Sequence, residues 1–404
     1  MRRRPVLVLS AIALLATPAL AQQSAAPGQS VTVTGNRLQD YRDRLAACLA
    51  RNCPVNEDVD ATAALAEALF LRGEYREART HVRASLGRNR DRARDFPEPV
   101  SDLYRIQTRL ARNIGLDQEA RRSSFEILNA LQAGIPREDY RHFTARFEIA
   151  ETQMMSGSFP GARRELQRLI QVARAADRAD VVTFAELRDL QYELIAFPGS
   201  DGRARLDQWS RLTDRTQRLR SVGAKLILAS VYRAEGNPAR ADALLAEVGR
   251  DYRGGDRRRL LHSPPYAVMQ QGTLMPQDSD IADAATYNMS RTLNRLSDNF
   301  ENAWVDVGFW ILPDGHVSGA EVLRRGADPA WAAPVLGAIR GRVYAAAAEP
   351  TYRIERYVYT AGYENVSGSR MATRSPRGRI EYFDLTDGGE QPAPPPPDGG
   401  RPAA

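Results

Sequence analysis

The sequence predicts an α-solenoid of helix hairpins followed by a small α+β domain of order β-β-α-β. A Gly-x4-Ala motif recurs through the middle of the chain, and apolar residues follow helical spacing on both sides of each motif. After residue 300 the apolar pattern changes to strict alternation, which is typical of strands. The 404 residues are enough for two or three domains, and enough to bury a core without a metal or disulfide framework.

Residues 1–21 have the pattern of a secretory signal peptide. Three arginines at positions 2–4 precede an apolar run that is shorter than a bilayer span, and Ala19-Leu20-Ala21 supplies a small-residue cleavage site before Gln22. We therefore expect a cleaved, periplasmic protein. The alternative is an uncleaved segment that anchors the chain in the inner membrane.

The charge of the chain excludes several classes of partner and cofactor. The formal charge is +6, from 56 Lys and Arg against 50 Asp and Glu, and removal of the three signal-peptide arginines lowers it to +3. A net charge this close to zero, on a chain that is expected to be exported, gives no reason to predict nucleic-acid binding. Four histidines and two cysteines supply little material for a metal site, so no metal and no cofactor are predicted. Lys225 is the only lysine, so arginine is nearly the only cation.

Residues 22–57 are predicted to contain an extended segment and then a helix that carries Cys48. Cys53 follows five residues later and is the only other cysteine. In an oxidising compartment a local disulfide is the preferred interpretation, with an expected stabilisation on the order of 2 kcal/mol. The alternative is two buried free thiols.

The repeats occupy residues 58–252. The glycines of the five motifs are Gly73, Gly115, Gly157, Gly199 and Gly236, each followed five residues later by alanine. The spacing is 42 residues three times and then 37. We interpret each unit as a helix hairpin, in which a left-handed glycine ends the first helix and the alanine allows close packing early in the second. The fourth unit, with Pro198 and Gly202, fits this pattern least well.

Two of the turns resemble the tetratricopeptide repeat family, because they read Gly73/Tyr75/Ala78 and Gly157/Phe159/Ala162. The other three units lack the aromatic residue, and the period exceeds that of the family. The resemblance implies stacked hairpins with a concave groove that binds peptide segments. Arginines in such a groove would favour acidic or C-terminal carboxylate groups, and the alternative is that they form a solvated face.

The C-terminal third begins with a linker, residues 253–299, in which a helix is expected over 278–300. The domain over 300–386 starts with a strand through Trp304–Ile311 and a turn at Pro313-Asp314-Gly315. A return strand through Val317–Val322, a helix over Asp328–Ile339 and a strand over Tyr352–Tyr359 follow. Residues 387–404 are Pro-rich and predicted to be a disordered tail.

The run Val305–Val317, followed by a helix that opens with Asp328-Pro-Ala-Trp, resembles the C-terminal domain of the TonB energy-transducer family. The resemblance implies that a partner strand adds to an exposed sheet edge, with the third strand as the partner-binding segment. The candidate residues are Tyr352, Ile354, Tyr357 and Tyr359. The chain departs from the family at Arg342-Val-Tyr344, where a proline is expected, and it lacks a Pro-rich spacer before the domain.

A short β-branched segment, Val31-Thr-Val-Thr-Gly35, resembles the segment of TonB-dependent outer-membrane receptors that this domain recognises. It raises the hypothesis that Val31–Gly35 pairs with the C-terminal sheet, in the same chain or in another. The alternative is an ordinary extended linker.

No catalytic constellation emerges from the sequence. The histidines are far apart, and neither a nucleophile elbow nor a phosphate loop is present. The preferred interpretation is a non-enzymatic interaction scaffold in the cell envelope, with protein or peptide partners such as TonB-dependent receptors and no small-molecule substrate. The alternatives are a TonB-type transducer that keeps its anchor, and an enzyme of unknown class.

Overall fold

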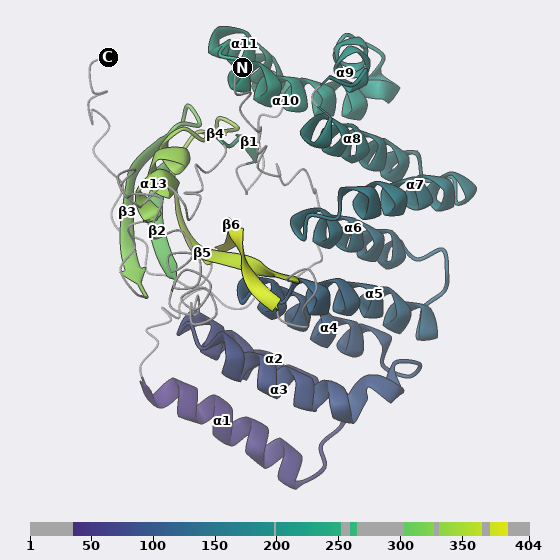
Figure 1. Cartoon of the computed structure of the whole chain (residues 1–404), viewed down its shortest axis with the longest axis vertical. Helices are drawn as coiled ribbons and strands as arrows, with labels where there is room; N and C mark the ends of the chain where they lie inside the picture. Colours follow the sequence, from purple (N-terminus) through teal and green to yellow (C-terminus); the bar gives the residue numbers. More distant parts are fainter. Residues whose placement is uncertain are drawn as a thin grey trace, which may run out of the picture.

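The computed structural model describes residues 35–197, 199–251, 259–264, 303–326, 331–365 and 372–386. These residues form a curved stack of helices, the repeat stack, and a sheet-containing unit, the sheet module, that comprises β1 (Leu260–His262) and the described residues from 303 onward (Figure 1). The helices of the stack are α1 (Gly35–Ala50), α2 (Val55–Leu71), α3 (Tyr75–Asn89), η1 (Arg90–Arg92), α4 (Pro97–Asn113), α5 (Asp117–Gly134), α6 (Tyr140–Met155), α7 (Phe159–Ala175), α8 (Ala179–Ala196), α9 (Gly202–Ser210), η2 (Arg215–Gln217), α10 (Arg218–Ala234) and α11 (Pro238–Asp251).

Four of the five predicted hairpin turns have the expected geometry. Gly73, Gly115, Gly157 and Gly236 have φ values of 82°, 75°, 76° and 80°, which a residue with a Cβ adopts only at a cost. At each turn the next residue donates its N–H to a carbonyl five residues earlier, as in Glu74 to Leu69 at 2.9 Å. The alanines that follow are fully buried: Ala78, Ala120, Ala162 and Ala241. The turn glycine and the packing alanine are therefore both confirmed.

The fourth unit differs from the other four. Gly199 does not have a positive φ, Ala204 is exposed, and α9 spans only 9 residues. Because a residue that precedes proline is disfavoured in helical geometry, Phe197-Pro198 ends α8 before the glycine. The sequence motif is present there, but the left-handed turn is not.

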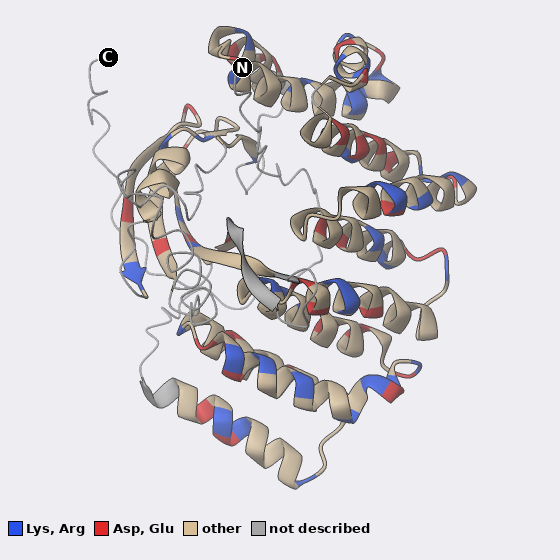
Figure 2. Cartoon of the chain, in the orientation of Figure 1, with Lys and Arg blue, Asp and Glu red and all other residues tan. Residues whose placement is uncertain are grey.

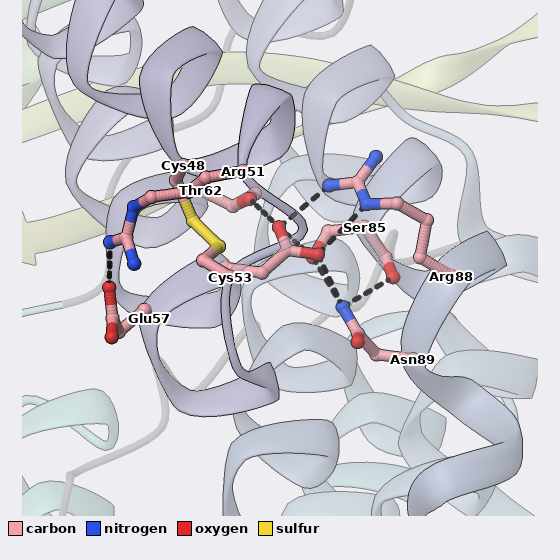
Figure 3. The surroundings of a disulfide bond; sticks show 9 residues. Cys48, Arg51, Cys53, Glu57, Thr62, Ser85, Arg88 and Asn89 are labelled. Carbon is pink, nitrogen blue, oxygen red and sulfur yellow. Dashed lines mark hydrogen bonds and ion pairs between the residues drawn. A yellow bond between two sulfur atoms is a disulfide. The ribbon is translucent and has the colours of Figure 1, made fainter.

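The stack begins before residue 58. Helix α1 packs on α2, and its Leu38 and Leu45 join the same buried cluster as Leu65 and Leu69. Cys48 and Cys53 form a disulfide between the end of α1 and the turn that leads into α2, with their Cα atoms 5.1 Å apart (Figure 3). The disulfide thus joins α1 to the start of the first hairpin.

The sheet module contains four antiparallel strands in the order β3-β2-β5-β6. The module also contains a second, two-stranded sheet, β1-β4. The turn between β2 and β3 closes at Gly315, which has a φ of 91°. The elements are β1 (Leu260–His262), β2 (Trp304–Ile311), β3 (Val317–Arg325), α13 (Ala332–Arg340), β4 (Val343–Tyr344), β5 (Thr351–Asn365) and β6 (Ala372–Asp384).

The predicted β-β-α-β order is present as β2, β3, α13 and β5, but three strands were missed. β1 lies in the segment predicted as linker, β4 follows the helix, and β6 continues the sheet beyond β5. The element order does not by itself establish a TonB-like domain. Residues 1–34, the whole of the predicted helix over 278–300, Asp328 and the tail over 387–404 lie outside the described residues.

Candidate interaction surfaces

One face of the sheet docks on the first hairpins of the stack. Trp304 of β2 and Val358 of β5 are buried in the same apolar cluster as Leu69 and Phe70 of α2. The ring of Phe383 on β6 meets that of Phe70 edge to face, with the centroids 5.0 Å apart. α13 and its apolar cluster lie on the other face of the sheet. The module is therefore covered on both faces near β5 (Figure 1).

Arg356 of β5 anchors this contact and has no exposed side-chain surface. Its guanidinium binds both carboxylate oxygens of Asp306, at 2.7 and 3.0 Å, and donates to the carbonyls of Phe70 and Leu71, the latter at 2.7 Å. It also lies 4.0 Å from the centroid of the Trp304 ring. The last carbonyls of a helix have no partner within the helix, so Arg356 caps α2. The ion pair with Asp306 lies within the sheet, whereas the bonds to the two carbonyls form only when the module is docked against the stack.

A second ion-pair group joins β6 to the α4–α5 turn. Arg379 binds the carboxylate of Asp117 at 2.6 and 3.0 Å and donates to the carbonyl of Arg112 at 2.9 Å. Glu381 accepts from Arg379 at 2.9 Å and from Arg112. Burial opposes ionisation of Glu381, but the two guanidinium groups outweigh it and hold the pKa of that carboxyl below its usual value. The module therefore contacts two successive hairpin turns through the buried Arg356 and the half-buried Arg379.

The module approaches the stack closely at Gly73, and a substitution there tests this contact. A Cβ at Gly73 would collide with the indole of Trp304, whereas Gly157 has a similar positive φ and open space around it. We expect Gly73→Ala to lower the free energy of unfolding by about 3 kcal/mol and Gly157→Ala by about 1 kcal/mol, since both carry the backbone cost but only the first meets a neighbour. Urea denaturation followed by circular dichroism measures both. Equal losses would contradict the close contact.

The other end of the module contacts the last hairpin. Leu261 of β1 and Ala345, just after β4, are buried in one cluster with Val222 and Leu226 of α10. The module therefore bridges the stack, from the α2 and α4 turns at one end to α10 at the other (Figure 1).

The four predicted partner-binding residues lie on β5 and are buried. Tyr357 and Tyr359 belong to the cluster beneath α13, and Tyr352 packs on Trp310 with the ring centroids 5.0 Å apart. β5 is an inner strand, because it pairs with β2 over Thr351–Val358 and with β6 from Glu355 onward. The expectation that this strand is an exposed edge is wrong, because the chain's own β6 occupies the position of an added strand. Whether Tyr352, Ile354, Tyr357 and Tyr359 bind a partner stays untested.

The outer strands of the sheet differ in exposure. β3 carries exposed side chains at Glu321, Leu323 and Arg325, and its pairing with β2 shifts register near Gly319 and Leu323. β6 pairs regularly with β5 from Gly378 to Asp384, but its side chains lie against α4 and α5. Among the described strands, β3 therefore presents the more exposed sheet edge.

Many arginines of the stack bind carboxylates on a neighbouring helix. Figure 2 shows these charges along the helices. The pairs include Arg42–Glu77, Arg79–Glu119, Arg105–Glu148, Arg141–Glu98, Arg163–Asp189 and Arg220–Glu186. A planar guanidinium can bind a carboxylate with two parallel hydrogen bonds, which a lysine cannot do. These arginines therefore join helices within the stack. The sequence had suggested either a groove for acidic groups or a solvated face, and neither interpretation included this role.

The described residues contain no group of three His, Cys, Asp or Glu side chains placed to hold a metal ion. The histidines are dispersed there as well: His81 lies on α3, His142 on α6, His262 on β1 and His316 just before β3. None of the described helices is both long and apolar enough to cross a membrane.

Comparison with known proteins gives no family assignment. No family model matches the chain, and no curated protein matches it. BtubC (BKLC) from P. vanneervenii is similar to it at 16% identity and a TM-score of 0.40, covering 55% of this chain and 94% of that one. A putative kinesin light chain from Podospora anserina, with nearly identical TPR-like repeats, is similar at 16% and 0.36, covering 47% and 92%. Apo RapI is similar at 14% and 0.33, covering 53% and 74%. Scores this low support no conclusion, so the description of the fold rests on the helices and strands themselves.

Proposed function

We propose that this chain is an exported, non-enzymatic interaction scaffold of the cell envelope that binds extended segments of partner proteins. The observation that carries the proposal is the exposed edge strand β3 on a sheet that Arg356 and Arg379 fasten to a helical repeat stack. An unpaired edge offers backbone donors and acceptors to an added strand. The signal-peptide pattern of residues 1–21 and the Cys48–Cys53 disulfide support the export part of the proposal.

The proposed site is the stretch Glu321–Arg325. Leu323 is 42% exposed, and Arg324 and Arg325 are also exposed. The two register shifts shorten the regular part of the edge, so the proposal predicts a short partner segment. Arg325 favours a segment that carries acidic residues, whereas Arg324 is already paired with Asp306 at 2.8 Å. TonB-dependent outer-membrane receptors are the partner class that the sequence resemblance suggests, and their recognition would be of this extended kind.

A proline on the edge strand tests the site. Leu323 lies at a register shift, where proline is tolerated, so Leu323→Pro removes a backbone donor and Leu323→Ala keeps it. We expect full-length chain to capture partners from an outer-membrane extract, Leu323→Pro to lose at least tenfold of that capture, and Leu323→Ala to retain it. Deletion from Asn302 onward serves as the second control. Equal capture of partners by all forms would indicate that the binding site lies in the repeat stack and not on β3.

Export of the chain is tested by a separate experiment. Sequencing the N-terminus of protein isolated from cells should find Gln22 first. A chain that begins at residue 1 and fractionates with the inner membrane would favour the anchored alternative instead.

A further inference from the structure

The contact between the module and the last hairpin contains an unusual buried histidine. His262 of β1 is 3% exposed, and its backbone pairs with Val343 of β4 while Leu261 beside it fills the α10 cluster. Among the described residues, its buried ring nitrogen Nδ1 has no hydrogen-bond partner, and neither does Nε of Arg233 on α10. Two polar nitrogen atoms thus lie unpaired in the small contact that holds this end of the module.

The charges around His262 disfavour a second cation there. Arg233 faces it from α10, and Asp242, which faces it from α11, is already paired with Arg233 and is itself largely exposed. On the β4 side its partner is the uncharged Val343, and Tyr344 belongs to the cluster beneath α13. Protonation of the imidazole would place a buried cation beside a guanidinium, and the described residues supply no free carboxylate to compensate it.

We propose that β1, β4 and α10 form an acid-sensitive clasp, in which protonation of His262 releases this end of the sheet module from the repeat stack. The arginine anchors at the α2 and α4 turns stay closed over the same range, because their guanidinium groups remain charged and hold the pKa of Glu381 low. The module would therefore swing open at one end only. This device goes beyond the proposed function and does not depend on the identity of any partner.

The direction of the pH effect follows from the two states of the histidine. Burial first, and then Arg233, lowers the pKa of His262 from 6.5 to about 4 in the closed clasp. In the open clasp the imidazole regains a pKa near its usual value, so the open form binds one more proton between these limits. The closed form is therefore fully favoured above pH 6.5 and loses about tenfold in its closing equilibrium per pH unit as the pH falls toward 4.

Hydrogen exchange on the full-length chain tests the clasp. After correction for intrinsic rates, we expect the protection of peptides over 259–264 and 343–345 to fall about tenfold per pH unit between pH 6.5 and 4.5. Peptides over the α2–α3 turn should keep constant protection. The fall should vanish in His262→Leu and persist in His316→Leu, because His316 is exposed and also bridges to Val343.

Each outcome decides for or against the clasp. Constant protection in the unmodified chain would overturn the proposal, and so would an unchanged fall in His262→Leu. Should His262→Leu fail to fold, Arg233→Gln provides the second test: loss of the neighbouring cation raises the pKa of His262 in the closed state, so the fall should end at a higher pH. A curve identical to that of the unmodified chain would contradict the assigned role of Arg233.

Discussion

Replacing Arg356 with methionine is expected to destabilise the chain by about 3–5 kcal/mol and to release the sheet from the first hairpins. The substitution leaves the buried Asp306 with Arg324 as its one ion-pair partner among the described residues, and it removes the donors to the carbonyls of Phe70 and Leu71. Methionine fills much of the same volume, so the loss is electrostatic and not a cavity effect. Urea denaturation gives the change in stability, and hydrogen exchange shows whether the end of α2 loses protection.

Two further variants separate the ion pair from the volume of the side chain. Arg325→Met removes an exposed arginine from the same sheet and is expected to change stability by less than about 0.5 kcal/mol. The double variant Asp306→Leu/Arg356→Leu removes both charges and should recover part of the loss, because the unpaired carboxylate is gone. If Arg356→Met proved as stable as Arg325→Met, the result would show that the module is held by apolar contact alone.

The hairpins could be predicted because their signals are local. A glycine that must adopt positive φ and an alanine five residues later describe one turn completely, and four of the five turns follow that rule. The exception, at Gly199, also has a local cause in Phe197-Pro198, which ends the preceding helix early. The hairpin of β2 and β3 was predictable for the same reason, through Asp314-Gly315.

The docking of the module could not be predicted, because its contacts join residues far apart in sequence. Arg356 binds the carbonyl of Phe70 across 286 positions, and Arg379 binds Asp117 across 262. Nothing in the neighbourhood of either arginine distinguishes it from the many arginines that pair within the stack. An arginine-rich composition thus concealed the few arginines that carry the long-range contacts.

The candidate edge was misplaced because β6, the outer strand that pairs with β5, was not predicted as a strand. Its segment carries several charges and Pro376, which from sequence favour a tail or an edge. In the structure Ile380 is buried against the cluster under α13, and Arg379 and Glu381, on the opposite face, meet their counter-charges on α4 and α5. Apolar and charged residues therefore do alternate along β6, as in an ordinary strand. Its charged face, however, lies against α4 and α5, a contact that could not be predicted from the sequence.

Asp58→Ala is the second substitution for which we expect a large effect, a loss of about 3–4 kcal/mol in the free energy of unfolding. The Asp58 carboxylate is buried and accepts hydrogen bonds from α2 and α3 together. Figure 3 shows its donors Ser85, Arg88 and Asn89 in the surroundings of the disulfide. Its donors are Thr62 at 3.1 Å, Ser85 at 3.2 Å, Asn89 at 2.7 Å and Arg88 at 2.7 and 2.8 Å. Alanine would leave the Thr62, Ser85 and Asn89 groups buried without this acceptor.

The matched control for this variant is Asp60→Ala, an exposed carboxylate two positions later in the same helix, which should cost less than about 0.5 kcal/mol. Acid provides an independent check. Burial raises the pKa of Asp58, but the hydrogen bonds from Arg88 and Asn89 outweigh it and keep the pKa below its usual value of 3.8. The ionised carboxylate therefore stabilises the fold above pH 3.8, and this contribution is lost as the pH falls through the lower, native pKa. Asp58→Asn should lack that acid-dependent loss, so the difference in stability between it and the unmodified chain should narrow below about pH 4. A difference that stays constant down to pH 2 would mean that the charge of Asp58 does not hold α2 and α3 together.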